Sequence, residues 1–446
     1  MLGTEPIGRL VLKMTLPTVA AQIVNLLYVI VDRIFIGHIP ETGDLALTGV
    51  GVVAPIITIV AAFSAFFGQG GAPIAAIALG HGDRSRAERI LGNSVILLTL
   101  MSVVLTVTIA LFSRPLLYLV GASDETFPYA SRYLSIYIIG TLPVLLTLGL
   151  APFVIAQGGS RLSMFATVAG CGTNIVLDLL LVRIFSLGVA GAAIATVISQ
   201  TVSAALLLHY LLFRASTMRL RLRGLRLSLS VTLAIASLGI SPFVMSSTES
   251  LIGFVMNSGL LRWGGVKYVG CLTVMQSVMQ FIGVPVSGFT QGVTAVISYN
   301  YGAGNIDRVK KTSWVVLGVM TVFSVLVAGS AMIFPGFYAR IFTDDAELTA
   351  LTVRYLPMFI SGMNIFGIQR CCQTIFLALK QAKISLFIAL LRKVFLLVPL
   401  ALVLPYRFGV AGVYMAEPIA DTVAAITCGV IFLSVIKKIL SRPAVS

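Results

Sequence analysis

The sequence predicts an all-α polytopic membrane protein, with twelve transmembrane helices in two six-helix lobes that are parallel repeats of each other. Hydrophobic residues make up 58% of the 446 residues and charged residues only 11%, whereas soluble domains carry about a quarter charged residues. Apolar runs of membrane-spanning length recur along the chain, and short motifs of the first half return in the second half. This composition excludes a soluble enzyme, a disordered scaffold and a secreted disulfide domain.

The apolar runs supply the predicted spans, since crossing about 30 Å of hydrocarbon takes about 20 helical residues. The first run follows Arg9 and Lys13 as a signal peptide would, but it is too long for one and contains Asp32, so it is predicted to be the first span. The spans are predicted at 14–36, 45–79, 90–112, 129–156, 162–184, 189–213, 229–258, 268–301, 312–334, 350–379, 385–404 and 409–436.

Charged residues in the gaps between spans alternate in sign and predict the orientation. One set of gaps is basic and includes both termini, with Arg9, Lys13, Arg84, Arg86, Arg89, Arg161, Arg214, Arg219, Arg221, Arg223, Arg226, Arg308, Lys310, Lys311, Lys380, Lys383, Lys437, Lys438 and Arg442. The other set is acidic, with Glu41, Asp44, Asp124, Glu125, Asp344, Asp345 and Glu347. Because basic loops stay in the cytoplasm, both termini are predicted to be cytoplasmic. This pattern accounts for the excess of 31 lysine and arginine residues over 16 aspartate and glutamate residues. No nucleic-acid partner is therefore expected.

Recurring motifs predict how the chain is divided. Gln69-Gly70 returns as Gln291-Gly292, and Arg132 to Leu134 returns as Arg354 to Leu356, each after 222 residues (291 − 69 and 354 − 132). Each half holds six spans, so the two copies enter the membrane from the same side, as in transporters built from parallel repeats. The predicted domains are an N-terminal lobe at 1–213, a basic cytoplasmic linker at 214–228 and a C-terminal lobe at 229–446.

The sequence lacks the motifs of common catalytic and ATP-driven machines. None of the nine lysines follows a glycine, so there is no Walker A motif. The three histidines are isolated, no G-x-S-x-G sequence occurs, and the five cysteines form no CxxC pair. No enzyme activity, catalytic residue or cofactor is therefore expected. A protein of this kind is expected to rock between two open states, driven by an ion gradient.

Acidic residues inside predicted spans mark a candidate ion site, since an ionisable group there costs roughly 2.5–3.5 kcal/mol on insertion scales. Asp32 lies late in the first span and Asp178 late in the fifth, with Asn174 four residues earlier on the same helix face. Thr196 lies at a similar depth in the sixth span. Three helices thus bring two carboxylates, an amide and a hydroxyl to one level, which suits a sodium ion or a proton.

A structural alternative pairs Asp32 with Arg33 and Asp178 with Arg183 near the membrane surface. Adjacent residues of a helix do not face each other, which disfavours the first of these pairs. Asn174 and Thr196 could also serve only to hold helices together.

The second lobe carries a different set of polar candidates. An ion pair between Arg392 and Asp421 is expected from their similar depth, with a structural and a functional role both open. Glu417 lies one helical turn before Asp421, and Glu249 either meets a cationic substrate or is merely hydrated. Gln69 and Gln291 are further candidates to line a cleft between the two halves. Neighbouring aromatic residues could line the same cleft: Phe63, Phe66, Phe67, Phe281 and Phe289. Aromatic residues in a membrane bundle more often pack against other helices or face lipid.

Several motifs, in order and at matching spacing, resemble the multidrug and toxic compound extrusion (MATE) family over essentially the whole chain. They are Leu16-Pro17, Val31-Asp32, Gln69-Gly70, Asn174 to Asp178, Gly188 to Thr196, Gln291-Gly292 and Tyr299 to Ala303. The resemblance implies a V-shaped pair of six-helix lobes that exports organic, often cationic, compounds in exchange for protons or sodium. It implies that Asp32, Asn174, Asp178 and Thr196 form the N-lobe cation site of the DinF-like branch. The NorM-like branch pairs a glutamate in span 7 with an aspartate in span 10, and here span 10 has no aspartate, which puts a C-lobe sodium site in doubt.

Three hypotheses for function follow. The leading one is a secondary efflux transporter of the bacterial or archaeal cytoplasmic membrane, which exchanges a small organic compound for H⁺ or Na⁺. The alternatives are a flippase of lipid-linked oligosaccharides from the same superfamily and a membrane scaffold that transports nothing. A monomer is expected, while the substrate and the choice between H⁺ and Na⁺ stay open.

Overall fold

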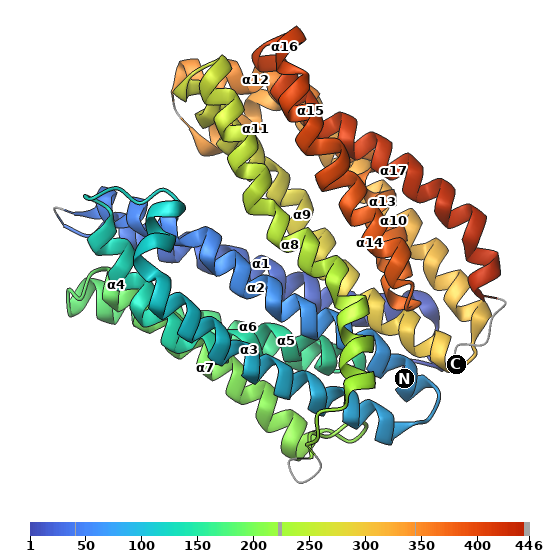
Figure 1. The fold of residues 1–446 in the computed structure, drawn as a ribbon. Coiled ribbons are helices and arrows are strands. Elements are labelled where there is room, and N and C mark those ends of the chain that lie inside the picture. The colour runs from blue at the N-terminus through green and yellow to red at the C-terminus, as the bar shows by residue number, and fades with distance from the viewer. Residues whose placement is uncertain (41, 222–224, 344, 441–446) are drawn as a thin grey trace.

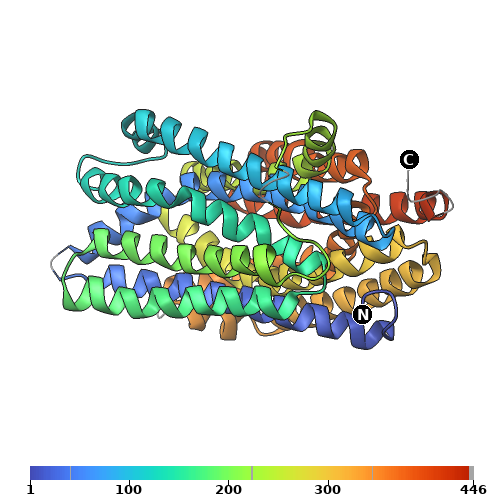
Figure 2. The ribbon, with the colours of Figure 1, turned by 90° about the horizontal axis from the view of Figure 1, so that it is seen from below.

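The computed structural model describes residues 1–40, 42–221, 225–343 and 345–440, and it consists of helices in two lobes that form a V (Figure 1). Four charges of the loop pattern, Glu41, Arg223, Asp344 and Arg442, lie outside the described residues, as do parts of the predicted linker and of the C-terminus. The lobes converge at the end where the chain begins and where the last described helix ends, as Figures 1 and 2 show.

The first lobe contains six long helical rods, three of which change helix type along their length. The fourth rod passes through a short 3₁₀ turn, and the fifth and sixth end in π-helical turns. Its elements are α1 (Ile7–Gly37), α2 (Gly43–Gly80), α3 (Arg84–Leu119), α4 (Phe127–Tyr137), η1 (Ile138–Gly140), α5 (Thr141–Ala156), α6 (Ser160–Asp178), η2 (Leu179–Ile184), α7 (Val189–His209) and η3 (Tyr210–Arg214).

The second lobe repeats this plan with more interruptions. The eleventh rod of the chain, which belongs to this lobe, includes a π-helical stretch. Short helices lie at the end of the lobe that is far from the N-terminus (Figure 1). Its elements are α8 (Leu229–Trp263), α9 (Val266–Gly302), α10 (Ile306–Ile333), α11 (Pro335–Phe342), α12 (Ala346–Ile360), α13 (Met363–Ala378), α14 (Ala382–Leu390), η5 (Leu391–Leu397), α15 (Val398–Val403), α16 (Pro405–Phe408) and α17 (Val410–Leu440).

The tenth predicted span, 350–379, is not one continuous helix. Eleven helices of the described residues are long and apolar enough to cross a membrane, and the tenth rod is divided into α12 and α13. At the break, the amide of Ser361 donates to Met358 O, three residues back rather than four. Gly362 packs so closely on α17 that a Cβ would lie 2.8 Å from Pro418 Cα, and this contact accompanies the local tightening. Counted as one rod, α12 and α13 bring the number of rods among the described residues to twelve.

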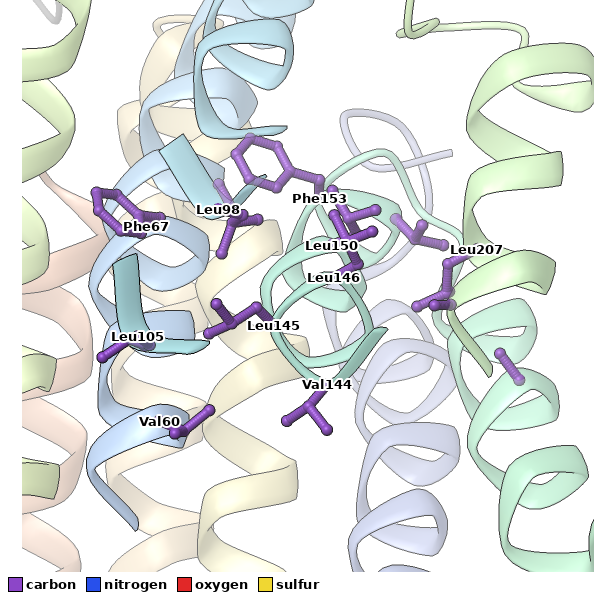
Figure 3. Packing of buried hydrophobic residues seen from close by; sticks show 14 of the residues in the cluster. Val60, Phe67, Leu98, Leu105, Val144, Leu145, Leu146, Leu150, Phe153 and Leu207 are labelled. Atoms are coloured by element: carbon purple, nitrogen blue, oxygen red, sulfur yellow. The ribbon is translucent and has the colours of Figure 1, made fainter. Parts of the chain in front are cut away.

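Each lobe is packed around its own apolar core. In the first lobe α5 lies at the centre, and its residues Leu145, Leu150 and Phe153 are fully buried. Figure 3 shows these side chains among residues of the neighbouring helices, such as Leu98 of α3 and Leu207 of α7. A second cluster fills the C-terminal lobe. The clusters meet at the junction of the lobes, where Ile235 and Leu238 of α8 belong to the first cluster and Val11 and Ile77 of the first lobe belong to the second.

Glycines bring the two lobes into backbone contact. Helix α2 packs along α8, and α1 packs along α9. A Cβ at Gly239 of α8 would lie 1.9 Å from Phe66 O of α2, and one at Gly302 of α9 would lie 2.0 Å from Ile77 O. Such close approach is possible only where no side chain intervenes, as at small-residue interfaces of membrane helices.

We expect Gly239→Leu to destabilise the contact between the lobes, because its side chain would overlap the α2 backbone. Overpacking of this kind costs about 1–3 kcal/mol, so the melting temperature in detergent should fall measurably. Gly253→Leu is the matched control on the same helix, since a Cβ there has nothing within 4 Å. Equal melting temperatures for the two variants would contradict this role of Gly239.

Candidate functional site

The four polar residues predicted for the first lobe lie on three helices that pack together. Asp32 lies on α1, Asn174 and Asp178 on α6, and Thr196 on α7, and α6 contacts both α1 and α7. All four are buried: Asn174 and Asp178 are 0% exposed, Thr196 is 4% exposed and Asp32 is 8% exposed. Asp178 ends α6, and the chain continues into the π-helical turns of η2, a departure from α-helical geometry that often accompanies functional sites.

The carboxyl groups of Asp32 and Asp178 are close enough to interact electrostatically. Ionised carboxylates can only accept hydrogen bonds, so these two groups satisfy each other only when they share a proton. With both ionised, Asp32 Oδ1 and both carboxylate oxygens of Asp178 have no donor among the described residues. A positive charge placed between these oxygens would satisfy both carboxylates.

The neutral partners of this site also lack hydrogen bonds. Both side-chain polar atoms of Asn174 and the hydroxyl of Thr196 are buried without a hydrogen-bond partner in the described part of the chain. Leaving a buried polar group unpaired costs about 1–3 kcal/mol. Four residues with unused oxygen atoms in one buried place are typical of a ligand site rather than of packing.

The structural alternative of arginine pairing does not describe the geometry. In the part of the chain that the structure describes, neither Asp32 nor Asp178 forms an ion pair with an arginine. The side chain of Arg33 is exposed, as expected for its position beside Asp32 on the helix.

Tyrosines around this site were missed by sequence reasoning. Tyr28 of α1 and Tyr133 of α4 lie near Thr196 without a hydrogen bond to its hydroxyl, and both are close enough to Asp32 to interact with it electrostatically. Tyr133 and Tyr137 are each 3% exposed and have stacked rings 6.2 Å apart. Their positions in apolar spans were the available signal, but helical periodicity alone does not tell which tyrosine faces the site.

The second lobe holds a separate cluster of buried charges centred on Arg392. Its Nε donates to Asp421 Oδ1 at 2.5 Å and its Nη2 donates to Glu417 Oε1 at 3.2 Å. Its guanidinium also lies 5.1 Å from the ring centroid of Phe366. The expected pair of Arg392 with Asp421 is present, and Glu417 completes a three-residue network.

The adjacent Lys393 was not predicted to matter, and it accounts for Glu249. Lys393 is 3% exposed and its ammonium forms an ion pair with the carboxylate of Glu249 on α8. Sequence reasoning left Glu249 between binding a cationic substrate and simple hydration, and in the structure it instead has a fixed cationic partner. Both Arg392 and Lys393 lie in the π-helical stretch η5 and both are buried.

Two cavities lie between the lobes and share the predicted glutamines Gln69 and Gln291. The larger has a volume of about 260 Å³, and its lining includes Tyr28 of the first lobe. The smaller has a volume of about 90 Å³, and its lining includes Arg370 of α13. Gln69 and Gln291 therefore lie where sequence analysis placed them, at the junction of the two halves.

The predicted phenylalanines do not line these two cavities. Phe63 and Phe66 pack on Phe243 of α8, with ring centroids 4.9 and 5.6 Å apart. Phe289 lines a small apolar pocket instead. These aromatic rings serve mainly in helix packing, as the alternative interpretation held.

Comparison with known proteins places this arrangement in context. The MatE family model matches residues 17–180 and 242–403. The multidrug export protein MepA of Staphylococcus haemolyticus (strain JCSC1435) is 25% identical over 417 residues, covering 92% of this chain and 90% of the relative. MepA of Staphylococcus aureus (strain MSSA476) is 24% identical over 430 residues, covering 95% and 92%.

Solved structures share the fold. An outward-facing multidrug resistance MATE family transporter of the MOP superfamily superposes with a TM-score of 0.91 at 22% identity, covering 99% of this chain and 98% of that chain. A MOP superfamily transporter from Pyrococcus furiosus superposes with a TM-score of 0.92, also at 22% identity and with the same coverage. The all-helical, two-lobed fold class predicted from the sequence is thereby confirmed.

Proposed function

Because this chain belongs to the MatE family of multidrug and toxic compound extrusion transporters, we propose that it exports small organic compounds by alternating access, coupled to a cation at Asp32, Asn174, Asp178 and Thr196. The observation that carries this proposal is the buried set of unpaired oxygen atoms in the first lobe. A buried acidic pair with no fixed cation is costly in a membrane protein and needs a function.

The site can hold either coupling ion. A proton shared between Asp32 and Asp178 satisfies the pair without further ligands. A sodium ion would be held by the same carboxylates with the side-chain oxygens of Asn174 and Thr196, since hard cations prefer oxygen ligands. In both cases, binding removes the repulsion between two neighbouring carboxylates and favours a conformation in which α1 and α6 stay close.

Helix α1 connects this site to the contact between the lobes. Asp32 lies near one end of α1, while Met14 and Val19 nearer the other end pack on Gly292 and Gly288 of α9. Pro17 lies inside α1 between Met14 and Val19, and the carbonyl of Lys13, which cannot receive a helix hydrogen bond from Pro17, accepts one from Ser160 Oγ at 3.2 Å. Cation binding at Asp32 is proposed to bend or straighten α1 at Pro17 and so shift the lobes.

The charge pattern of the loops supports an orientation with both termini in the cytoplasm of a bacterial or archaeal cell. The lobes then converge on the cytoplasmic side and diverge toward the outside. A monomer suffices for this mechanism, because the site and both cavities are made by one chain. The branch of the family is proposed to be the DinF-like one, since its four N-lobe positions are all present.

The flippase alternative is not favoured. A lipid-linked pyrophosphate needs several cations in the central cavity, yet the residues lining the two described cavities between the lobes include one charged side chain, Arg370. Both MepA relatives are named as multidrug export proteins.

The decisive experiment is uptake of a fluorescent organic cation into inverted membrane vesicles, under an imposed proton gradient or an imposed sodium gradient. We expect one of the two gradients to drive uptake and its collapse to stop it. Dye uptake that is the same with and without either gradient, together with translocation of a labelled lipid, would refute the proposed ion-coupled export and support the flippase.

A further inference from the structure

We infer that Arg370 forms a subsite for a carboxylate group of the transported compound, in the smaller cavity between the lobes. This inference rests on the proposed export function and names the substrate chemistry: an amphiphilic compound with an apolar body and one carboxylate, alone or beside a positive charge. This adds a negatively charged group to the organic, often cationic, compounds that the family resemblance implies.

The cavity places Arg370 in a lining that carries no opposite charge. Its polar lining residues are all uncharged apart from Arg370: Gln69, Ser241, Thr290, Gln291, Thr294, Gln373, Thr374 and Ser385. Prolines and alanines, such as Pro152 and Ala72, supply apolar surface. A cation group entering this cavity meets a like charge, whereas a carboxylate meets an attractive one.

Arg370 is the one cation of its neighbourhood without a carboxylate partner among the described residues. Arg392 is paired with Asp421 and Glu417, and Lys393 is paired with Glu249. The guanidinium of Arg370 lies 5.9 Å from the centroid of the Phe366 ring. The guanidinium of Arg392, which belongs to the buried ion-pair network of the second lobe, lies near the same ring. The three acids of the cluster are thus ion-paired with the other two cations. Glu249 is close enough to attract Arg370 electrostatically but forms no ion pair with it, and Arg370 lines the smaller cavity.

The chemistry of the group favours a carboxylate in particular. A guanidinium presents donors in a planar fork that matches two carboxylate oxygens. One fixed cation balances one negative charge, so a monoanionic carboxylate fits better than a doubly charged phosphate. Burial between the lobes strengthens the interaction, since the local dielectric is below that of water.

The test compares a fluorescent dye that carries a free carboxylate with its methyl ester, which differs by that one charge. Binding of both dyes to the purified full-length protein is measured in detergent without any ion gradient. We expect wild-type protein to prefer the carboxylate dye. Arg370→Gln should weaken its binding by roughly one to two orders of magnitude, as expected for a lost hydrogen bond to a charged group. Binding of the ester should stay unchanged, and Arg370→Lys should fall between, because it keeps the charge but loses the planar fork.

Arg354→Gln is the matched control, since Arg354 is exposed, lies over the Tyr355 ring at 5.5 Å and does not line the cavity. It should leave the binding of both dyes unchanged. A wild type without preference for the carboxylate dye, or an Arg370→Gln variant that loses both dyes equally, would overturn the inference. Ion-driven uptake of the carboxylate dye into vesicles that contain the wild-type protein is scored separately. Its absence would refute the proposed export, while the binding comparison still decides the role of Arg370.

Discussion

Asp32→Asn is expected to abolish ion-driven export while leaving the protein folded. The amide keeps the shape of the carboxyl group and can donate a hydrogen bond to Asp178, so the buried site stays satisfied. It can neither take up a proton nor contribute a negative charge to a sodium ion. Uptake of an organic cation into inverted vesicles should therefore fall to the level of vesicles without the protein, at an unchanged amount of monodisperse protein.

Asp44→Asn provides the control for this prediction. Asp44 is an exposed acid in the first turn of α2, in the same lobe but outside the buried site. Its loss should leave gradient-driven uptake as in the wild type. If vesicles with Asp32→Asn still concentrate the dye under the same gradient, the proposed coupling site is wrong and another group must carry the ion.

Arg392→Met is expected to destabilise the protein more than Gly239→Leu does. It leaves Glu417 and Asp421, 8% and 1% exposed, without their cation. Removing one partner of a buried ion pair typically costs about 3–5 kcal/mol, because the remaining charge is uncompensated. The melting temperature of the detergent-solubilised protein should drop sharply, and the expression level should fall with it.

A double variant separates charge imbalance from loss of packing. Adding Asp421→Asn to Arg392→Met removes one of the two uncompensated charges, so it should recover part of the lost stability, as a double-mutant cycle would report. A melting temperature for Arg392→Met that equals that of the wild type would show that the network is not a stabilising element. A double variant that melts lower still would point to packing around Phe366 instead.

Much of the fold was predictable because the membrane imposes simple rules. Length and hydropathy predict the rods, and the 222-residue repeat predicts two lobes. The break between α12 and α13 was not predictable, since hydropathy does not register a local tightening at Ser361 and Gly362. It depends on the close approach of Gly362 to Pro418 on another helix.

The sequence by itself determined the membrane class and the repeat. Because helical rise converts position along a span into depth, it also predicted that Asp32, Asn174, Asp178 and Thr196 lie at one level. Depth alone does not say which way a side chain faces or which cation a given acid meets. Only the tertiary structure decided that Glu249 pairs with Lys393, that tyrosines surround Thr196 and that Arg370 lines a cavity between the lobes. These facts depend on helix rotation and on π-helical turns, which are selected by packing between helices distant in the chain and leave no periodic signal in the residues themselves.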